Sequence, residues 1–295
     1  MTSNGLLVLD KPLGMSSRQA LDRVRRRYRT RKAGFAGTLD PLASGVLVCA
    51  LGVATRLLTY LEGDAKRYRA IVELGRETDT DDAEGRTVAQ GDWHAVGRAQ
   101  VDAALVAFRG PLRQRPPAYS AISIGGQRLY ALARRGEAVV APEREVTIYA
   151  LDLTDWRPPQ FALDVRCSKG TYIRALARDL GRTLGCYAYL AGLRRTASGA
   201  FTLDQATTLE QLEAAGDDRL ATYLLPPRAA VAHLPAVALE SDEVDRVRSG
   251  QRLRRSEAGD GPVALVDGDG IVVGVGRSVA GTIQPEKVLP PPDEA

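Results

Sequence analysis

The order of strand-like and helix-like segments is the feature that most constrains this fold. Residues 5–10 form a short apolar run that ends before a proline, residues 68–74 alternate as a strand does, and residues 161–167 are again strand-like. Amphipathic patterns over 99–110 and 172–185 predict helices, yet no regular β-α-β repeat is present. The sequence therefore predicts an α+β fold rather than a doubly wound sheet.

A further helix is predicted to begin after a cap at Ser16 or Ser17 and to carry a dense basic cluster. Residues 23–32, RVRRRYRTRK, hold seven basic side chains in ten positions, on the exposed side of this helix. Such a cluster can neutralise nucleic-acid phosphates, or it can be a solvated helix face. Both interpretations stay open at this stage.

The chain contains two histidines, His94 and His233, and neither lies near a motif. A Ser/His/Asp triad and a multi-histidine metal site are thereby excluded. Any chemistry must use carboxylates, Tyr, Lys, Arg or hydroxyl groups. The net charge of +4 is mildly basic and identifies no partner by itself.

The three cysteines, Cys49, Cys167 and Cys186, are too scattered to predict a disulfide framework or a zinc site. No apolar run approaches the roughly 18 residues that span a bilayer, and the N-terminus does not resemble a signal peptide. We therefore expect a cytoplasmic protein without membrane association.

The acidic segment TDTDDAEG, residues 78–85, has the spacing of the first two EF-hand ligands at Asp79 and Asp81. Ala83 and Glu84 stand where another oxygen ligand and a glycine are required. We interpret the segment as an acidic turn, and no metal site is predicted.

A domain boundary is predicted within residues 224–237, where proline and alanine dominate. Beyond it, two apolar strands flank the turn sequence DGDG, a strong hairpin signal. We therefore predict a small β-rich C-terminal domain over residues 236–290.

The segment GFAGTLDPLASGV, residues 34–46, contains one charged residue, Asp40, directly before a proline. Local preferences favour a helix start here, with Asp40 as the N-cap and Pro41 as the first helical residue. A reactive carboxylate is the alternative, and the two are compatible, because the proline can stabilise the backbone that presents the side chain.

Motifs follow one another in a fixed order through about the first two hundred residues. They are KPLGMSS (11–17), KAGFAGTLDPLASGVL (32–47), ATR (54–56), KRYRA (66–70), GRETDTDDAEG (75–85), PPAYSA (116–121), CSKGTYIRALARDLG (167–181) and GCYAYLAGLRRTASG (185–199). In this order they resemble the bacterial tRNA pseudouridine synthases of the TruB family.

The resemblance implies a pseudouridine synthase fold over residues 1–228, with a mixed, mainly antiparallel sheet flanked by helices. Residues 115–140 resemble the family's mobile insert, which clamps the T stem-loop. Residues 236–290 are similar to the small RNA-binding PUA domain of many family members.

The implied activity is the isomerisation of uridine 55 in the T loop of tRNA, without a metal or other cofactor. The substrate is the T stem-loop, and the resemblance implies a monomer that needs no protein partner and no guide RNA. Two alternatives are a tRNA-binding or tRNA-folding protein in which catalysis is dispensable, and a guide-RNA-dependent relative.

The resemblance assigns Asp40 as the nucleophile, Arg174 as its partner, and Tyr68 as the residue that stacks on the base and takes the last proton. A carboxylate can stabilise or trap a sugar whose glycosidic bond is broken. A nearby arginine favours the charged form of that carboxylate. Without the resemblance, Tyr68 is equally consistent with a core position and Arg174 with the exposed side of a helix.

Further residues are assigned to RNA by the same resemblance. The substrate-binding candidates are Phe35, Gly37, Thr38, Tyr172, Leu193 and Lys11, and the RNA-backbone candidates are Arg25, Arg26 and Arg29. Leu193 is also consistent with a core residue.

Two positions depart from the family pattern. Phe35 stands where the family usually has a histidine that helps to fill the space of the flipped base. A phenylalanine can stack there but cannot form hydrogen bonds. Tyr189 also stands where histidine is common.

Overall fold

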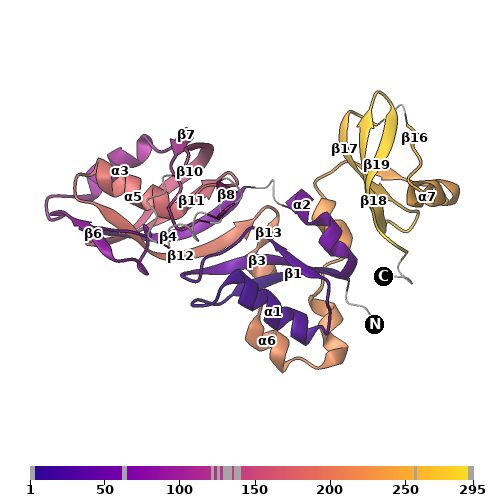
Figure 1. Cartoon of the computed structure of the whole chain (residues 1–295), viewed down its shortest axis with the longest axis horizontal. Coiled ribbons are helices and arrows are strands. Elements are labelled where there is room, and N and C mark those ends of the chain that lie inside the picture. Colours follow the sequence, from indigo (N-terminus) through magenta and orange to yellow (C-terminus); the bar gives the residue numbers. More distant parts are fainter. Residues whose placement is uncertain are drawn as a thin grey trace.

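The computed structural model describes residues 4–61, 65–120, 123–124, 127–128, 135, 141–255 and 258–291. These residues form a large sheet and a smaller C-terminal sheet, with helices packed on both (Figure 1). The α+β class predicted from the order of segments is confirmed.

The large sheet consists of β1 (Gly5–Lys11), β2 (Ala33–Ala36), β3 (Ala43–Leu51), β4 (Lys66–Leu74), β7 (Gly110–Gln114), β10 (Arg144–Arg157), β11 (Gln160–Cys167), β12 (Ala188–Ser198), β13 (Phe201–Thr202) and β14 (Thr207–Thr208). Its order is β14-β1-β3-β12-β4-β11-β10-β7, with β2 beside β3 and β13 beside β12. The β1/β14 and β3/β12 pairs are parallel and the others antiparallel. The sheet is mixed and mainly antiparallel, as expected from the resemblance.

The helices that pack on this sheet are α1 (Ser17–Arg27), α3 (Arg98–Val106), α5 (Ile173–Thr183) and α6 (Leu209–Ala214). In Figure 1, α3 and α5 lie beside β10 and β11, whereas α1 and α6 lie beside β1. One continuous core cluster includes Leu21 of α1, Leu176 and Leu180 of α5, and Val72 and Leu163 of the central strands.

Local sequence signals account for several element ends. Ser16 caps α1, because its side chain accepts a hydrogen bond from the Gln19 amide while the Gln19 side chain accepts one from the Ser16 amide. Helix α5 is followed by Gly185 in the left-handed conformation, which is common just after the end of a helix. The apolar run at 46–51 is the buried part of β3.

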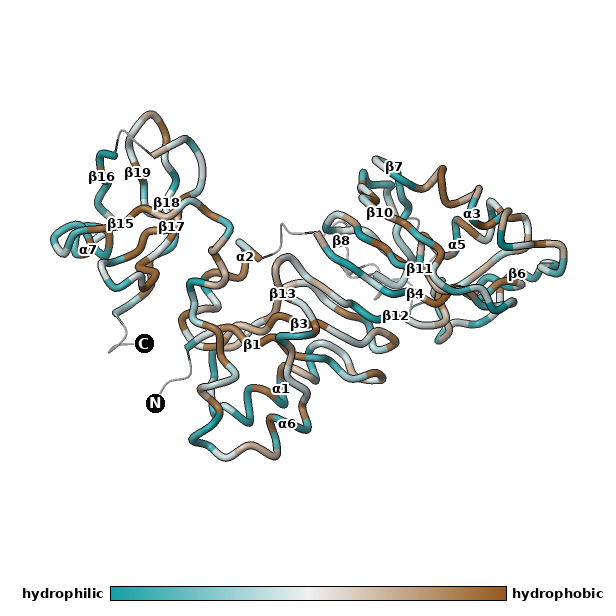
Figure 2. The backbone as a smooth tube through the Cα atoms, turned by 180° about the vertical axis from the view of Figure 1, so that it is seen from behind, coloured by the Kyte–Doolittle hydropathy of each residue, from teal (hydrophilic) through white to brown (hydrophobic). Residues whose placement is uncertain are grey.

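The C-terminal sheet has the order β15-β17-β18-β19-β16 and carries one flanking helix, α7. The bounds are β15 (Ala236–Ala238), α7 (Ser241–Arg248), β16 (Leu253–Arg254), β17 (Gly261–Val266), β18 (Val272–Val279) and β19 (Thr282–Val288). Figure 2 shows hydrophobic residues along β1 and β17 and a largely hydrophilic α7. Val275 and Leu289 share a core cluster with Leu61 of α2 (Leu58–Leu61) and with Val46 and Val48 of β3, so the two sheets are connected by one continuous apolar core.

Two short hairpins are also described: β5 (Arg76–Thr78) with β6 (Thr87–Gln90), and β8 (Ser123–Ile124) with β9 (Gln127–Arg128). The remaining described elements are the 3-10 helices η1 (Gly52–Leu57), η2 (Leu203–Gln205), η3 (Asp217–Tyr223) and η4 (Pro227–Val231). Most of the insert predicted at 115–140 lies outside the described residues.

Candidate active site

Asp40 lies in the loop of residues 37–42 between β2 and β3. Ser17 Oγ donates to the Leu39 carbonyl (2.9 Å) and accepts from the Leu39 amide (2.8 Å), and the Gly14 amide donates to the Pro41 carbonyl (2.8 Å). The Asp40 side chain remains 41% exposed on this anchored loop. The expectation of a helix start is wrong: the Ala43 amide donates to the Asp40 carbonyl (3.0 Å), and the turn leads into strand β3.

Arg174 reaches Asp40 from the first turn of α5. Its Nη2 lies 3.0 Å from Asp40 Oδ2, and its side chain is only 7% exposed. Nη1 donates to the Thr80 carbonyl and Nη2 to the Tyr119 carbonyl, each at 3.1 Å. The local alternative, an exposed helix position for Arg174, is wrong, because the guanidinium is buried and is held beside the Asp40 carboxylate.

Arg174 also contacts a second carboxylate. Asp82 Oδ2 lies 3.3 Å from Arg174 Nη1, and the Asp82 side chain is 4% exposed. Two carboxylates therefore share one guanidinium, and both line one cavity, with Asp40 far more exposed than Asp82. Glu84 also lines this cavity; burial, together with the nearby Asp82 and Asp40, raises its pKa.

A second buried ion pair, between Arg178 and Asp81, lies next along α5 from the Arg174–Asp82 pair. Arg178 Nη1 lies 2.7 Å from Asp81 Oδ2, and both side chains are less than a tenth exposed. Burial raises the pKa of Asp81 to about 6, while Arg178 opposes that shift. The acidic segment predicted to be a turn therefore supplies partners to the arginines of α5.

Tyr68 of β4 is 7% exposed and forms part of the wall of the same cavity. Burial raises its pKa, and the adjacent Arg195 acts in the opposite direction. The cavity has a volume of about 640 Å³. Other residues that line it are Gly37, Thr38, Leu39, Pro41, Lys66, Thr80, Tyr119, Ser120, Gly170, Thr171, Tyr172, Ile173, Leu193 and Arg195.

Four of the predicted substrate-binding residues, Gly37, Thr38, Tyr172 and Leu193, thus line the cavity that holds the catalytic candidates. Phe35 lies in an adjoining cavity of about 650 Å³, which shares Gly37, Thr38, Lys66 and Gly170 with the first.

Lys11 does not line either of these cavities. It is fully buried, and its Nζ donates to the carbonyls of Pro12 (2.9 Å) and Met15. Burial lowers the pKa of Lys11 to about 8, although Asp40 acts in the opposite direction. The Lys11 side chain therefore stabilises the backbone of residues 12–15 and does not face the substrate cavity.

The three predicted RNA-backbone arginines differ in their surroundings. Arg25 pairs with Asp22 (3.1 Å) and Arg29 with Asp217 (3.3 Å). Arg26 is exposed and donates to the Asp22 carbonyl. Much of this basic cluster is therefore charge-balanced within the protein.

Sequence reasoning missed Arg195 and Asp82 as site residues. Arg195 is 1% exposed and lies directly opposite Tyr68 in the β12/β4 pairing. Because side chains alternate along a strand, Arg195 lies on the same face as Leu193. This two-residue spacing was the sequence signal that could have identified Arg195 as a site residue. The pairing with Tyr68 is long-range and could not be derived locally.

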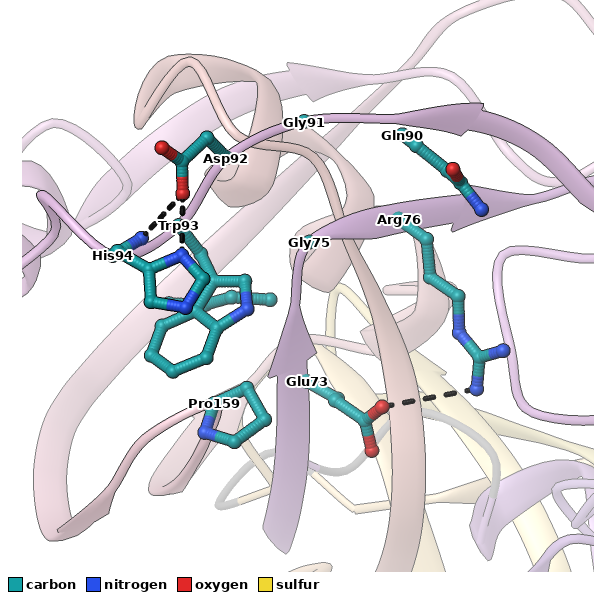
Figure 3. A pocket seen from close by; sticks show the side chains of 10 residues that line it. Glu73, Gly75, Arg76, Gln90, Gly91, Asp92, Trp93, His94 and Pro159 are labelled. Carbon is teal, nitrogen blue, oxygen red and sulfur yellow. Dashed lines mark hydrogen bonds and ion pairs between the residues drawn. The ribbon is translucent and has the colours of Figure 1, made fainter.

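A separate cavity of about 490 Å³ lies at the other end of β4 (Figure 3). It is lined by Glu73, Leu74, Gly75, Arg76, Gln90, Gly91, Asp92, Trp93, His94 and Pro159. His94 stacks on Trp93 with ring centroids 4.3 Å apart, and its Nδ1 lies 2.6 Å from Asp92 Oδ1. A Cβ on Gly75 would lie 2.7 Å from Trp93 Cδ1, so the indole packs directly on the Gly75 backbone. No catalytic candidate lines this cavity.

Tyr189, the second departure from the family pattern, is buried away from the catalytic cavity, where its hydroxyl accepts a hydrogen bond from Arg76 Nη2 (2.6 Å). Within the described ranges no cluster of three or more His, Cys, Asp or Glu side chains is placed to hold a metal ion. No helix in the same part of the chain is long and apolar enough to cross a bilayer.

Comparison with known families gives three consecutive matches. Residues 25–173 match the TruB family pseudouridylate synthase N-terminal domain, residues 174–232 the tRNA pseudouridylate synthase B C-terminal domain, and residues 235–289 the pseudouridine synthase II TruB C-terminal domain.

Curated relatives match over almost the whole chain. Proteins named tRNA pseudouridine synthase B from Xanthomonas campestris, Parasynechococcus marenigrum and Pseudomonas aeruginosa are each 44% identical over 97% of this chain, and the matches cover 94%, 97% and 96% of those proteins.

Solved structures with the same architecture include a chain of an H/ACA ribonucleoprotein bound to a substrate RNA containing 2′-deoxyuridine, with a TM-score of 0.77. A Cbf5–Nop10–Gar1 complex contains another, with a TM-score of 0.76. Both are 25% identical, and the matches cover 99% of this chain and 86% of theirs.

The fold and the matches define the class as a pseudouridine synthase. The chain belongs to the TruB family of these enzymes. It is accordingly an isomerase that converts uridine to pseudouridine in tRNA.

Proposed function

We propose that this enzyme isomerises uridine 55 in the T loop of tRNA, with Asp40 as the nucleophile on a flipped-out uridine. The observation that carries the proposal is the convergence of Asp40, Tyr68 and Arg174 on one cavity of about 640 Å³. This volume is within the range of small-ligand sites and admits a single nucleoside. A nucleoside inside a duplex or stacked loop must be extruded to enter it.

The reaction breaks the N1–C1′ bond and forms a C5–C1′ bond, with no change in oxidation state. Asp40 is the part-exposed cavity carboxylate that pairs with Arg174, and we assign it to act on the ribose. Direct attack at C1′ and elimination to a glycal both need a carboxylate beside the sugar. The arrangement supports the role of Asp40 in either route.

Arg174 supplies the positive charge that orients Asp40. Its contacts with the Thr80 and Tyr119 carbonyls and with Asp82 hold the guanidinium rigidly. A preorganised donor of this kind stabilises charge in the transition state without reorganisation. Asp82 is therefore assigned as a residue that positions Arg174.

Tyr68 provides an aromatic wall for the extruded base. Stacking on an aromatic ring contributes ~1–3 kcal/mol per base and helps to offset the unstacking of the nucleotide. Its hydroxyl is the candidate acceptor for the C5 proton that leaves in the last step.

The proposed substrate is the T stem-loop of tRNA, bound by a single chain without a guide RNA or protein partner. Support comes from relatives named tRNA pseudouridine synthase B at 44% identity, against 25% for the H/ACA and Cbf5 chains. We assign T stem-loop contacts to Phe35 and to the 115–140 insert, and contacts elsewhere on the tRNA to the C-terminal sheet.

Replacing Asp40 with Asn tests this proposal. On an unmodified T-stem-loop RNA with no guide present, D40N should lose turnover by on the order of 10³-fold or more, while the dissociation constant for RNA changes little. Asp164→Asn is the matched control, since Asp164 lies on the opposite face of the sheet. Wild-type-like turnover by D40N would refute the assignment, and a wild-type enzyme active only with a guide RNA would refute stand-alone action.

A further inference from the structure

Arg195 is a buried arginine with an unusual charge environment. Its Nε donates to the Val46 carbonyl (2.7 Å) and its Nη2 to the Gly37 carbonyl (2.9 Å). No Asp or Glu oxygen of the described residues lies within 4.0 Å of its guanidinium, although Arg174 nearby has two such partners. A buried cation without a carboxylate is costly, and an apolar side chain of similar size would serve the fold better.

The backbone of Arg195 is fixed against β3. Gly45 pairs with Arg195 across the two strands, and a Cβ at Gly45 would lie 2.2 Å from the Arg195 carbonyl oxygen. Only glycine permits this approach, at a φ of 103°. The position of the Arg195 side chain in the cavity is therefore restricted, and its guanidinium contacts the loop that carries Asp40.

Tyr68 is the direct neighbour of Arg195 in the antiparallel β12/β4 pairing. Residues so paired have Cβ atoms ~4.5–5.5 Å apart on one face of the sheet. The two side chains therefore project from neighbouring strands on the same face of the sheet, and both line the catalytic cavity.

Only the phenolate form of Tyr68 can accept the C5 proton, and burial disfavours this charged form unless a nearby cation stabilises it. Burial raises the pKa of Tyr68, and Cys167 of β11 and Asp40 of the loop raise it further. Arg195 is the cation beside Tyr68 that lowers this pKa.

We propose that Arg195 is a positioning residue that holds the Tyr68 oxygen and stabilises its negative charge while Tyr68 removes the C5 proton. The inference rests on the base role given to Tyr68 in the proposed function. After the C5–C1′ bond has formed, the C5–H bond breaks and its electron pair restores the C5–C6 double bond. The C6–N1 double-bond electrons pass to N1, which takes up one proton. The phenolate accepts the C5 proton and returns it to solvent, so that no proton is gained or lost overall.

The test compares Arg195→Met and Arg195→Lys with wild type on T-stem-loop RNA that carries uridine or 5-deuterouridine at the target position. In R195M, single-turnover conversion should fall by about 10²-fold, because proton transfer to a positioned base contributes about 10²–10⁴-fold. The ratio of protium to deuterium rates should rise above the wild-type ratio, since C5 deprotonation becomes the slow step. R195K should lie between wild type and R195M.

A second substrate separates this role from a structural one. Fluorine at C5 cannot leave as a proton, so 5-fluorouridine RNA reports bond cleavage and C–C bond formation without deprotonation. R195M should convert 5-fluorouridine RNA at a near-wild-type rate. Arg194→Met is the matched control: Arg194 pairs with Asp10 (2.7 Å) and does not line the cavity, and this variant should match wild type in every assay.

An unchanged isotope effect in R195M, or an equal loss of rate on uridine RNA and 5-fluorouridine RNA, would overturn the proposal. Either result would mean that Arg195 only supports the loop that carries Asp40. If R195M fails to fold, the isotope effect in R195K decides. Tyr68→Phe separates the proposed role of Tyr68 as the base from the proposed role of Arg195 in supporting it. Full activity in Y68F would remove the proposed role of Tyr68 itself, whereas an inactive Y68F beside a normal R195M would refute the role of Arg195 alone.

Discussion

Helices α1 and α5 both carry several arginines, but Arg23 of α1 lies in a different environment from Arg174 and Arg178 of α5. On α1, Arg23 pairs with Glu213, and both side chains are more than a third exposed. On α5, Arg174 and Arg178 lie buried against aspartates that are themselves buried. An exposed ion pair contributes little because water screens it, whereas breaking a buried pair leaves an uncompensated charge. The denser basic segment is therefore not the one that supports the cavity.

The largest expected effect comes from Arg174→Met. Asp40 would lose its partner, and turnover should fall by about 10²–10³-fold or more. Asp82 would stay buried without its guanidinium, and the free energy of unfolding should fall by about 3–5 kcal/mol. Single-turnover assays and urea unfolding measure the two effects, with Arg23→Met as the surface control. Equal effects of the two substitutions would abolish the distinction between the helices.

Arg178→Met removes a buried arginine that does not touch Asp40. Asp81 would lose its partner at 2.7 Å, which should cost about 3–5 kcal/mol of unfolding free energy. Turnover at a temperature where the variant is folded should fall much less than in R174M. Adding Asp81→Asn should recover part of the stability, and strictly additive effects would contradict a direct interaction between the two residues.

The pH dependence of stability sharpens the same comparison. The pKa of Asp81 is raised by burial to about 6, above its ordinary value of 3.8, so the folded state binds this proton more tightly than the unfolded state. The stabilisation is complete below about pH 4 and is lost as the pH rises through about 6. Relative to Asp81→Asn, the wild-type free energy of unfolding should fall by about 1–3 kcal/mol between pH 4 and pH 7.5. Urea titrations at several pH values measure this difference, and a pH-independent difference would refute the shift.

On α1, Glu213→Gln should change the free energy of unfolding by about 1 kcal/mol or less, because the Arg23–Glu213 pair is exposed. Chemical unfolding of the variant and wild type in the same buffer measures this change. A loss comparable to that in R178M would show that the surface pair is not screened.

The smallest effect is expected from Arg26→Gln combined with Arg29→Gln. If these side chains bind tRNA phosphates, the slope of log affinity against log salt should become shallower by about one for each phosphate that is no longer neutralised. Binding titrations over a salt series measure the slope. Arg23→Gln is the control, since two hydrogen bonds hold Arg23 on Glu213, whereas Arg29 is 82% exposed and lies 3.3 Å from Asp217. An unchanged slope would identify the cluster as a solvated face.

Local sequence was sufficient for much of the fold. The Ser16 cap, the helix at α5 and the alternation along β4 were all predictable, because capping and amphipathic periodicity depend on residues a few positions apart. The same local preferences gave the wrong result at Asp40, where a helix start was expected and a turn into β3 is found. There, pairing with neighbouring strands outweighs the capping preference.

The catalytic candidates Asp40, Tyr68 and Arg174 were predictable from an ordered set of motifs, but their partners were not. Asp82 meets Arg174 across a separation of 92 positions. Arg195 meets Tyr68 through strand register. Motif order determined the family and its candidate residues. Burial and long-range pairing, which depend on the whole sheet, decided which charges face the cavity and which residues support them.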